Sequence, residues 1–142
     1  MPHQNTPLDT IINVWMMWPN VTVEGLSKFI SDDCVTHEAP SLPYGGDWVG
    51  PQGFFDLMNV LQETWSDFQF SFETVLTNHR DIVSYRGRIS GGTPHGRFDM
   101  PVVEYWRFRD GKAVDILPVY FDSGSLVALH EGRRGDFIVL QD

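Results

Sequence analysis

The sequence predicts an α+β fold, in which about three N-terminal helices cover one face of a curved antiparallel sheet. Before residue 66, apolar residues recur at helical spacing in three places, and from residue 68 onward they alternate with polar residues as in half-buried strands. Turn signals separate the later segments, namely Gly-Gly-Thr-Pro at 91–94 and Asp-Gly at 110–111. Helices that precede a run of hairpin-connected strands are typical of this class.

Three helices are expected in the N-terminal half. The first ends before Pro19, and its apolar face consists of Leu8, Ile11, Ile12, Trp15 and Met16. The second begins at the N-cap Thr22 and stops before residues 31–33, and its apolar stripe consists of Val23, Leu26, Phe29 and Ile30. The third opens at Pro51, and its inward residues are Phe54, Leu57, Met58, Leu61 and Trp65.

The strands are expected around and after these helices. A short strand covers residues 34–38, and the segment 39–53, rich in Pro and Gly, reads as an exposed irregular loop. A long strand from residue 68 shows one face made of Phe68, Phe70, Phe72, Thr74 and Leu76. An antiparallel meander is completed by three further strands at residues 81–90, 97–109 and 112–121.

The composition indicates one globular domain without disulfides. The chain has 142 residues, 42% of them apolar, and a domain of this length removes roughly 70% of its unfolded surface from water. Its one cysteine, Cys34, cannot form an internal disulfide, and no His or Cys spacing typical of a metal site occurs. We therefore expect a single domain over residues 1–142 that uses no metal and no cofactor.

Charge and hydropathy disfavour two classes of partner. The 19 Asp and Glu residues outnumber the 10 Lys and Arg residues, and the net charge of −9 repels nucleic acid. No apolar run reaches the length of about 18 residues that a membrane span needs, and the start of the chain lacks the pattern of a signal peptide. We expect a soluble, cytoplasmic protein that binds neither nucleic acid nor membranes.

Glu104 is the first candidate for chemistry. It interrupts a strand face that is otherwise apolar and consists of Met100, Val102, Trp106 and Phe108. If this face turns toward the helices, burial raises the pKa of the Glu104 carboxyl and keeps it protonated, so that it can donate a hydrogen bond. The alternative is a structural glutamate paired with Arg86 or Arg88 across the sheet.

Glu38 and His95 are two further candidates. Glu38 ends the short strand and could project into the same cavity, which would turn His37 to the opposite face. The alternative for Glu38 is an exposed strand end without a role. His95 lies in the turn Gly-Gly-Thr-Pro-His-Gly, where it serves as acid, base or donor if the turn folds over a pocket, and is otherwise solvated.

The order of elements, with the segments FISDDCVTHEAP and EYWRFRDGKAVDILPVYFD, resembles the nuclear-transport-factor-2-like superfamily over about residues 8–130. The sequence is most similar to SnoaL-like polyketide cyclases and ketosteroid-isomerase-like proteins. The resemblance implies a cone in which helices on the concave face of the sheet enclose a hydrophobic pocket, in a homodimer packed through the sheet. Residues 131–142 form an extension, and we expect that removing residues 136–142 lowers thermal stability or weakens a dimer.

The resemblance also implies roles for the two acids. Aligned on the acidic pair at 32–33, Glu38 takes the place of the base of ketosteroid isomerase. Aligned on the aromatic-Arg-Phe segment at 106–108, Glu104 takes the place of its protonated acid. The tyrosine that the isomerase carries on its first helix has no counterpart, since Val14 or Trp15 stands there, and steroid isomerisation by that route is not expected.

The many aromatic residues, which include 5 Trp and 10 Phe, suit either an apolar pocket for a flat ligand or an ordinary core. We expect a small hydrophobic ligand to contact Val14, Trp15, Trp18, Trp48, Phe54, Met58, Phe72, Tyr85, Val102, Trp106, Val119 and Phe121.

Two functions fit these features. The first is a cofactor-free isomerase, cyclase or dehydratase, in which Glu38, as the more solvated carboxylate, removes a proton next to a carbonyl. Glu104 then hydrogen-bonds the resulting enolate. The second is a non-catalytic module that holds an apolar molecule or a partner in the same pocket. The two acids favour the enzyme, whereas the absent helix-one tyrosine favours the binding module.

Overall fold

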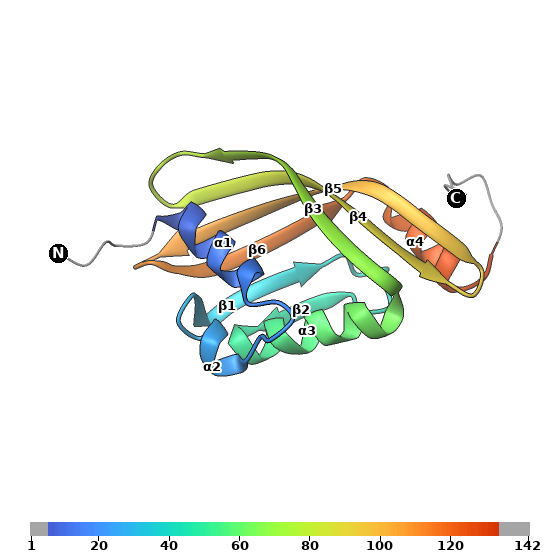
Figure 1. Ribbon diagram of the computed structural model, residues 1–142, viewed down its shortest axis with the longest axis horizontal. Coiled ribbons are helices and arrows are strands. Elements are labelled where there is room, and N and C mark those ends of the chain that lie inside the picture. Colours follow the sequence, from blue (N-terminus) through green and yellow to red (C-terminus); the bar gives the residue numbers. More distant parts are fainter. Residues whose placement is uncertain (1–5, 134–142) are drawn as a thin grey trace.

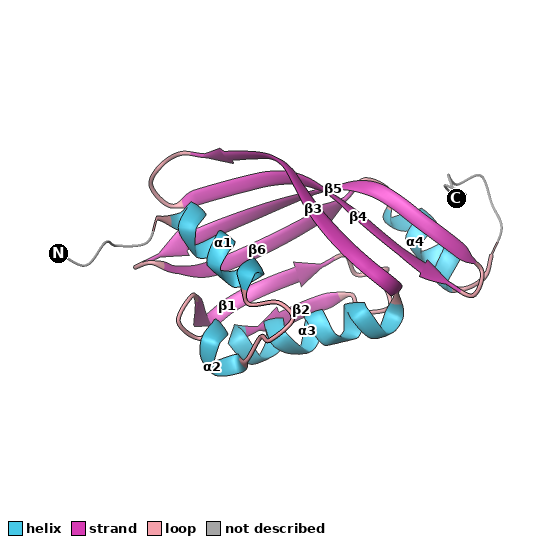
Figure 2. Ribbon diagram, in the orientation of Figure 1, coloured by secondary structure: helices cyan, strands magenta, loops and turns pink. Residues whose placement is uncertain are grey.

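The computed structural model describes residues 6–133, which form four helices and one six-stranded curved sheet (Figures 1 and 2). The helices are α1 (Pro7–Met16), α2 (Val23–Leu26), α3 (Gly50–Thr64) and α4 (Ser123–His130). The strands are β1 (Ile30–Glu38), β2 (Gly46–Val49), β3 (Ser66–Thr77), β4 (Ile82–Thr93), β5 (Gly96–Arg109) and β6 (Lys112–Tyr120).

The sheet has the strand order β2-β1-β6-β5-β4-β3. The strands β3 to β6 form an antiparallel meander, and β2 pairs antiparallel with β1. Only β1 and β6 run parallel among the paired strands of the described chain. Figure 1 shows α1 crossing the sheet, α3 along β1 and β2, and α4 near the end of the β4–β5 hairpin. The predicted α+β class and the meander are confirmed.

The first helix begins as its sequence predicts, but it turns a different face inward. Thr6 is the N-cap, with its hydroxyl accepting from the Asp9 backbone N–H at 3.2 Å. Ile11 and Val14 are buried against the sheet. Ile12 is 48% exposed, so the expected apolar face of this helix is partly wrong.

The second helix is one turn long, which is much shorter than predicted. Its N-cap is Thr22 as expected, and its side chain accepts from the Gly25 N–H at 3.0 Å. The helix ends at Leu26 because the chain then hydrogen-bonds to β6 of the sheet. The Ala113 N–H donates to the Phe29 carbonyl at 2.9 Å. Residues 31–33, expected to separate a helix from a strand, therefore belong to β1.

The segment rich in Pro and Gly is more ordered than predicted. It contains β2, and Leu42 and Tyr44 in it are only 4% and 2% exposed. The chain turns tightly at Gly45, where a Cβ atom would lie 2.5 Å from the Ala39 carbonyl oxygen. The third helix follows at Gly50, and its five predicted inward residues are all buried.

A β-bulge changes the face that β3 shows after its midpoint. The pairing register with β4 shifts between Phe72 and Thr74. Beyond the shift Val75 lies opposite Tyr85, and Leu76 is 68% exposed. An extra residue on one strand reverses the alternation of side chains. The predicted apolar face is therefore wrong after Phe72.

Short turns connect the long strands of the meander. Asp110 and Gly111 both have positive φ angles, 51° and 80°, as the predicted two-residue hairpin requires. Between β4 and β5 the strand continues through Thr93, and the turn consists of Pro94 and His95 alone.

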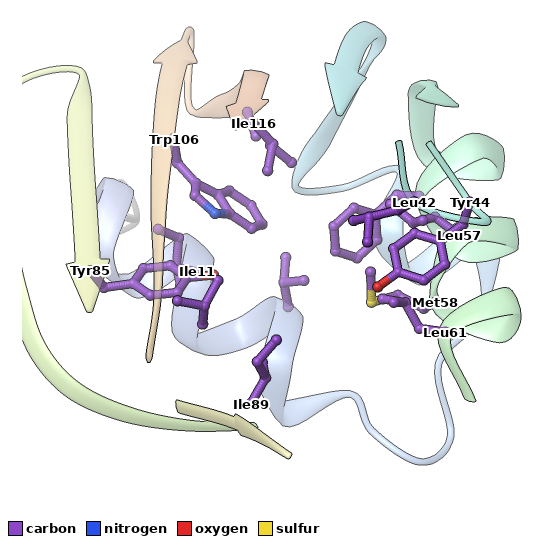
Figure 3. Packing of buried hydrophobic residues seen from close by; sticks show 14 of the residues in the cluster. Ile11, Leu42, Tyr44, Leu57, Met58, Leu61, Tyr85, Ile89, Trp106 and Ile116 are labelled. Carbon is purple, nitrogen blue, oxygen red and sulfur yellow. The ribbon is translucent and has the colours of Figure 1, made fainter. Parts of the chain in front are cut away.

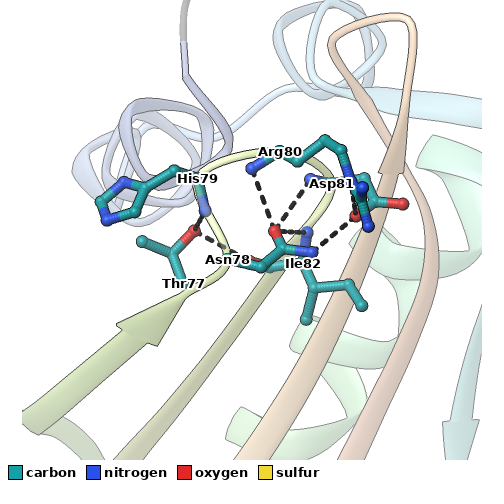
Figure 4. Close-up of polar contacts among 6 residues, drawn as sticks. All are labelled: Thr77, Asn78, His79, Arg80, Asp81 and Ile82. Carbon is teal, nitrogen blue, oxygen red and sulfur yellow. Dashed lines mark hydrogen bonds and ion pairs between the residues drawn. The ribbon is translucent and has the colours of Figure 1, made fainter.

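The turn between β3 and β4 is organised by Asn78 (Figure 4). Its side-chain oxygen accepts from the backbone N–H groups of Arg80, Asp81 and Ile82, each at 3.0 Å. Its amide nitrogen donates to the Asp81 carboxylate at 2.8 Å. One side chain thus satisfies three backbone donors of this turn, whose Asp81 carbonyl also accepts from the Phe108 N–H of β5 at 2.8 Å.

The C-terminal helix α4 has no counterpart in the predicted elements. Asp122 caps it by accepting from the Ser125 N–H at 3.0 Å, and Leu126 and Leu129 are buried. Its buried residues are not spaced on one clear helical stripe, which explains why periodicity missed it. The prediction about residues 136–142 lies outside the described residues.

The hydrophobic core lies between the inner face of the sheet and the helices α1 and α3 (Figure 3). Ile11 comes from α1, Leu57 from α3, and Tyr85, Trp106 and Ile116 from three neighbouring strands. The buried polar side chains of the described residues include two carboxyl groups on strands, those of Glu38 and Glu104.

Candidate functional site

The inner face of β5 carries the first of these carboxyl groups, as its alternation predicts. Glu104 is 9% exposed and Trp106 is fully buried. Neither arginine of the alternative interpretation contacts Glu104. Arg86 pairs with Glu73 at 3.2 Å, and the Arg88 guanidinium pairs with Asp99 at 2.8 Å.

The Glu104 carboxyl lies among aromatic side chains. The Trp106 indole N–H donates to its Oε1 atom at 3.0 Å. Burial raises the pKa of Glu104 above its usual range, and the Tyr85 hydroxyl and the Trp106 N–H oppose this only in part. Glu104 therefore resists ionisation and can act as a hydrogen-bond donor.

Glu38, the last residue of β1, carries the second carboxyl group. It is 4% exposed, and the Tyr120 hydroxyl donates to its Oε2 atom at 2.7 Å. Burial raises its pKa to about 8, the Tyr120 hydrogen bond opposes this, and nearby Glu104 adds to it. Glu38 is therefore buried like Glu104, and the expected contrast between a solvated and a buried carboxyl group is small.

His37 points to the outer face of the sheet, as predicted. Its two ring nitrogens lie 2.8 Å from Asp47 on β2 and 2.8 Å from Asp115 on β6. Partial burial lowers the pKa of His37, but the hydrogen bonds and charges of both carboxylates outweigh this and raise it. His37 thus links three strands and takes no part in the inner face.

The two glutamates line one small cavity, which we call the acid pocket. Its volume is about 30 Å³, which is room for roughly one water molecule. Apart from Glu38 and Glu104 its lining is mainly apolar, with side chains from α3 such as Phe54 and Leu61. Residues distant in the sequence are thus brought together, but a ring does not fit between the two carboxyl groups.

A larger opening, the aromatic groove, adjoins the acid pocket. Its volume is about 490 Å³, and it is lined by Trp15, Trp18, Met58, Gln62, Trp65, Asp67, Phe68, Phe70 and Phe72. Trp15, Met58, Phe68 and Phe70 line both spaces. Trp15 and Phe70 stack with ring centroids 5.2 Å apart, so they form part of the wall between groove and acid pocket.

A third space, the back cavity, of about 410 Å³ also adjoins the acid pocket. Glu38, Pro118 and Tyr120 line both the acid pocket and the back cavity. The parallel pairing of β1 with β6 reaches only to Thr36 opposite Ile116, so the two strands are unpaired beside Pro118. Glu38 thus lies where two strands of the sheet separate.

Two further buried donors lie near Glu104. The Tyr85 hydroxyl and the Trp15 indole N–H are buried and make no hydrogen bond within the described part of the chain. Trp15 lines both the groove and the acid pocket, so an oxygen atom of a ligand is a suitable partner for its N–H, whereas the Tyr85 hydroxyl lies in the core close enough to Glu104 and Trp15 to interact with both.

The structure brings only part of the expected ligand site together. Trp15, Trp18, Phe54, Met58, Phe72 and Val102 line the groove or the acid pocket. Val14, Tyr85 and Trp106 are buried in the core and line neither space. Trp48 is half-buried and donates from its ring nitrogen to the Tyr44 carbonyl at 3.0 Å.

Three expected site residues lie elsewhere. Val119 and Phe121 are 52% and 71% exposed, because the register places Pro118 opposite Glu104 and so turns the even-numbered residues of β6 inward. His95 is exposed in its turn, and its ring lies against Gly132 after α4. The structure therefore does not bring His95 to either glutamate.

Tyr120 and the adjacent Tyr44 are among the residues at the site that the sequence did not predict. Tyr120 would have been found by extending the β5 alternation to β6, had the bulge at Arg107 and Phe108 been known. Tyr44 lies in a segment that carries no periodic signal, so only the structure reveals it.

The fold is that of nuclear-transport-factor-2-like proteins. A protein of this class from Burkholderia thailandensis E264 has 19% sequence identity and a TM-score of 0.71, and the match covers 81% of this chain and 90% of that one. A model of the SnoaL-like domain matches residues 17–116, and the chain belongs to this family.

Two further solved structures are similar in fold. TerC, crystallised with polyporic acid, has 17% identity and a TM-score of 0.74, with 88% of this chain and 98% of that chain covered. IdmH from Streptomyces antibioticus, proposed to be a polyketide cyclase, has 20% identity and a TM-score of 0.66, with 89% and 99% covered. No protein with a curated description matches the sequence.

Two features are absent from the described residues. No helix among them is long and apolar enough to cross a membrane. Within residues 6–133, no group of three or more His, Cys, Asp or Glu side chains is placed to hold a metal ion.

Proposed function

We propose that the protein is a cofactor-free acid–base enzyme of the isomerase, cyclase or dehydratase type, acting on a small hydrophobic carbonyl compound. The observation that carries this proposal is that Glu38 and Glu104, from two different strands, line one buried pocket. Glu38 is the base that removes a proton from the carbon next to the carbonyl. Glu104 is the acid that hydrogen-bonds the enolate oxygen.

The pKa of Glu38 supports its role as base. With a pKa of about 8, roughly one tenth of Glu38 is ionised at pH 7, and a base works best when its pKa lies near the working pH. The rate of proton removal is expected to rise with pH and to level off above about pH 8. A rate that is flat between pH 6 and pH 9 contradicts this assignment.

The aromatic groove supports a substrate with a flat ring. Its volume of about 490 Å³ falls within the usual range of ligand sites, about 300–1,000 Å³. Since the acid pocket holds only about one water molecule, the ring lies in the groove and the carbonyl end displaces the stacked Trp15 and Phe70 to reach the acids. Polyporic acid, with which TerC was co-crystallised, is one compound to test for binding to the groove.

Hydrogen exchange tests the proposal even while the natural product of the reaction is unidentified. Aryl ketones and cyclic enones are incubated with the protein in D₂O, and loss of the proton next to the carbonyl is followed by NMR. Glu38→Gln and Glu104→Gln are each expected to slow exchange by about 10²- to 10⁴-fold. Glu63→Gln, on the exposed face of α3, is the matched control and keeps the full rate.

The outcomes separate the two candidate functions. Full exchange in both Glu38→Gln and Glu104→Gln overturns the proposal. A compound that binds the groove and is recovered without any exchange points to a binding module instead.

We further propose that the protein acts in the cytoplasm as a homodimer packed through the outer face of the sheet. Val103, Leu117 and Val119 are 42%, 41% and 52% exposed there, on the neighbouring strands β5 and β6. Exposed apolar residues grouped in this way are typical of an interface. Light scattering is expected to give the mass of a dimer, and Val119→Glu the mass of a monomer; a monomeric wild type refutes the assembly.

A further inference from the structure

We propose that Tyr120 is a positioning residue, which ties one oxygen of the Glu38 carboxylate to the protein and leaves the other free to take a proton in the acid pocket. This inference rests on the proposed function of Glu38 as base. Tyr120 donates to Oε2 at 2.7 Å, and Oε1 accepts no hydrogen bond within the described residues.

Tyr120 is itself held in place by buried neighbours. The Trp65 indole N–H donates to the Tyr44 hydroxyl at 3.0 Å, and both side chains are almost completely buried. The Tyr44 hydroxyl in turn lies close enough to Tyr120 for each to alter the pKa of the other. Side chains from the end of α3, the segment before β2, β6 and β1 thus meet in a row that ends at Glu38.

Tyr120 remains a neutral donor throughout. Burial, the neighbouring Glu38 carboxylate and Tyr44 raise the pKa of Tyr120 well above its usual range. A hydrogen bond from a neutral hydroxyl favours the ionised form of the carboxylate that accepts it. Tyr120 thereby counteracts the burial that would otherwise keep Glu38 protonated and inactive as a base.

The other titratable groups around Glu38 are few, so the effect of Tyr120 can be isolated. Glu104 faces it from β5 and opposes its ionisation, and Tyr44 interacts with both Tyr120 and Glu38. The residues that α3 contributes to the acid pocket are Phe54, Met58 and Leu61, none of which titrates. His37 and Asp47 line the back cavity with Glu38, but they bond each other at 2.8 Å, and neither is among the groups that shift the pKa of Glu38.

The place of the Tyr120 ring next to Glu38 does not by itself require a hydroxyl group, and a substitution can test the two contributions separately. Tyr120 lines both the acid pocket and the back cavity, as Glu38 does, so its ring covers part of Glu38 in both spaces. A phenylalanine keeps that cover and loses only the hydroxyl. Tyr120→Phe therefore distinguishes the hydrogen bond from the packing of the ring.

The experiment is an NMR titration of the full chain labelled with ¹³C at glutamate carboxyl groups, with Glu38 assigned by Glu38→Gln. In Tyr120→Phe the pKa of Glu38 is expected to rise by about one pH unit, since a hydrogen bond to a charged group is lost. The pH dependence of kcat/KM on an aryl ketone should move upward by the same amount. KM should change little, because the hydroxyl faces Glu38 and not the aromatic groove.

Two controls keep the result interpretable. Tyr105→Phe, on the outward face of β5, should leave the pKa of Glu38 unchanged. If Tyr120→Phe fails to fold, Tyr44→Phe provides the test, with a smaller rise in the same direction expected. An unchanged pKa of Glu38 in a folded Tyr120→Phe, or in Tyr44→Phe in that case, overturns the proposal.

Failure of the proposed function is recognised separately, because the titration needs no substrate. Turnover that survives Glu38→Gln removes the role of Glu38 as base, and with it the role of Tyr120 in catalysis. Turnover that depends on Glu38, combined with an unchanged pKa in Tyr120→Phe, overturns the positioning role alone.

Discussion

His37 and Glu38 are neighbours on β1, yet they lie on opposite faces of the sheet in opposite surroundings. Glu38 is 4% exposed and accepts a hydrogen bond from the neutral Tyr120 hydroxyl. The side chain of His37 is 39% exposed and lies between two carboxylates. Both groups hold their proton more tightly than usual, Glu38 because it has lost water and His37 because it has gained anions. Two adjacent residues of β1 thus have raised pKa values for two different physical reasons.

Both raised pKa values make the free energy of unfolding fall as pH rises. The folded protein keeps the Glu38 proton up to about pH 8, whereas the unfolded chain loses it near 4.5, so the free energy of unfolding falls as pH rises between these values. The stabilisation from protonated His37 is complete below about pH 6.5 and is lost as pH rises through its higher folded pKa. Salt separates them, because it screens exposed charges and leaves burial unchanged.

The largest expected effect tests the difference between the two faces through packing. On β5, Trp106→Ala should lower the free energy of unfolding by about 3–5 kcal/mol, because it leaves a cavity in the core. Val103→Ala, three residues earlier and 42% exposed, should cost less than about 1 kcal/mol. Urea denaturation of both variants, at concentrations where the protein is monomeric, measures this, and similar losses would contradict the assignment of faces.

A smaller effect is expected from Glu38→Gln, which removes a buried ionisable group. The variant should be more stable than the wild type at pH 8, by roughly 2 kcal/mol or more, and should show a weaker decline of stability from pH 5 to pH 8. Thermal unfolding across this range is the measurement. Glu63→Gln should keep the wild-type pH dependence, and a Glu38→Gln curve parallel to the wild type would show that Glu38 ionises freely.

The smallest effect belongs to the outer face. His37→Gln should cost less than about 1 kcal/mol at pH 6, because the group is more than one-third exposed and its ion pairs are screened. The loss should shrink as pH rises and again in about 0.5 M salt. The effect of Glu38→Gln at pH 8 should persist in the same salt. If salt abolishes both effects equally, the raised pKa values of Glu38 and His37 have the same cause.

Alternation along a strand made much of the site predictable. It placed Glu104 on the inner face of β5 and set His37 and Glu38 on opposite faces, because each inference needed only the local period of two. The Asp-Gly turn was predictable for a similar reason, since positive φ angles favour these residue types.

The failures have a different physical origin. A bulge in β3 moved Thr74 and Leu76 out of the predicted face, and the register of β6 put Tyr120 where Val119 and Phe121 were expected. Both depend on how one strand meets another. The short α2 and the buried Tyr44 likewise reflect tertiary contacts that outweigh local propensity. The meeting of the two glutamates in one cavity became visible only in three dimensions.

Pro118 helps to keep β1 and β6 from pairing next to the acid pocket, which the polar groups of the site do not do. Proline has no backbone N–H, so the stretch of β6 beyond Ile116 cannot donate a ladder bond from this position if β1 draws near. Unpaired backbone N–H and C=O groups at a strand edge tend to form hydrogen bonds with a neighbouring strand. Because Pro118 lacks this N–H, β1 and β6 stay apart beside Glu38, and no bulky side chain is needed to separate them.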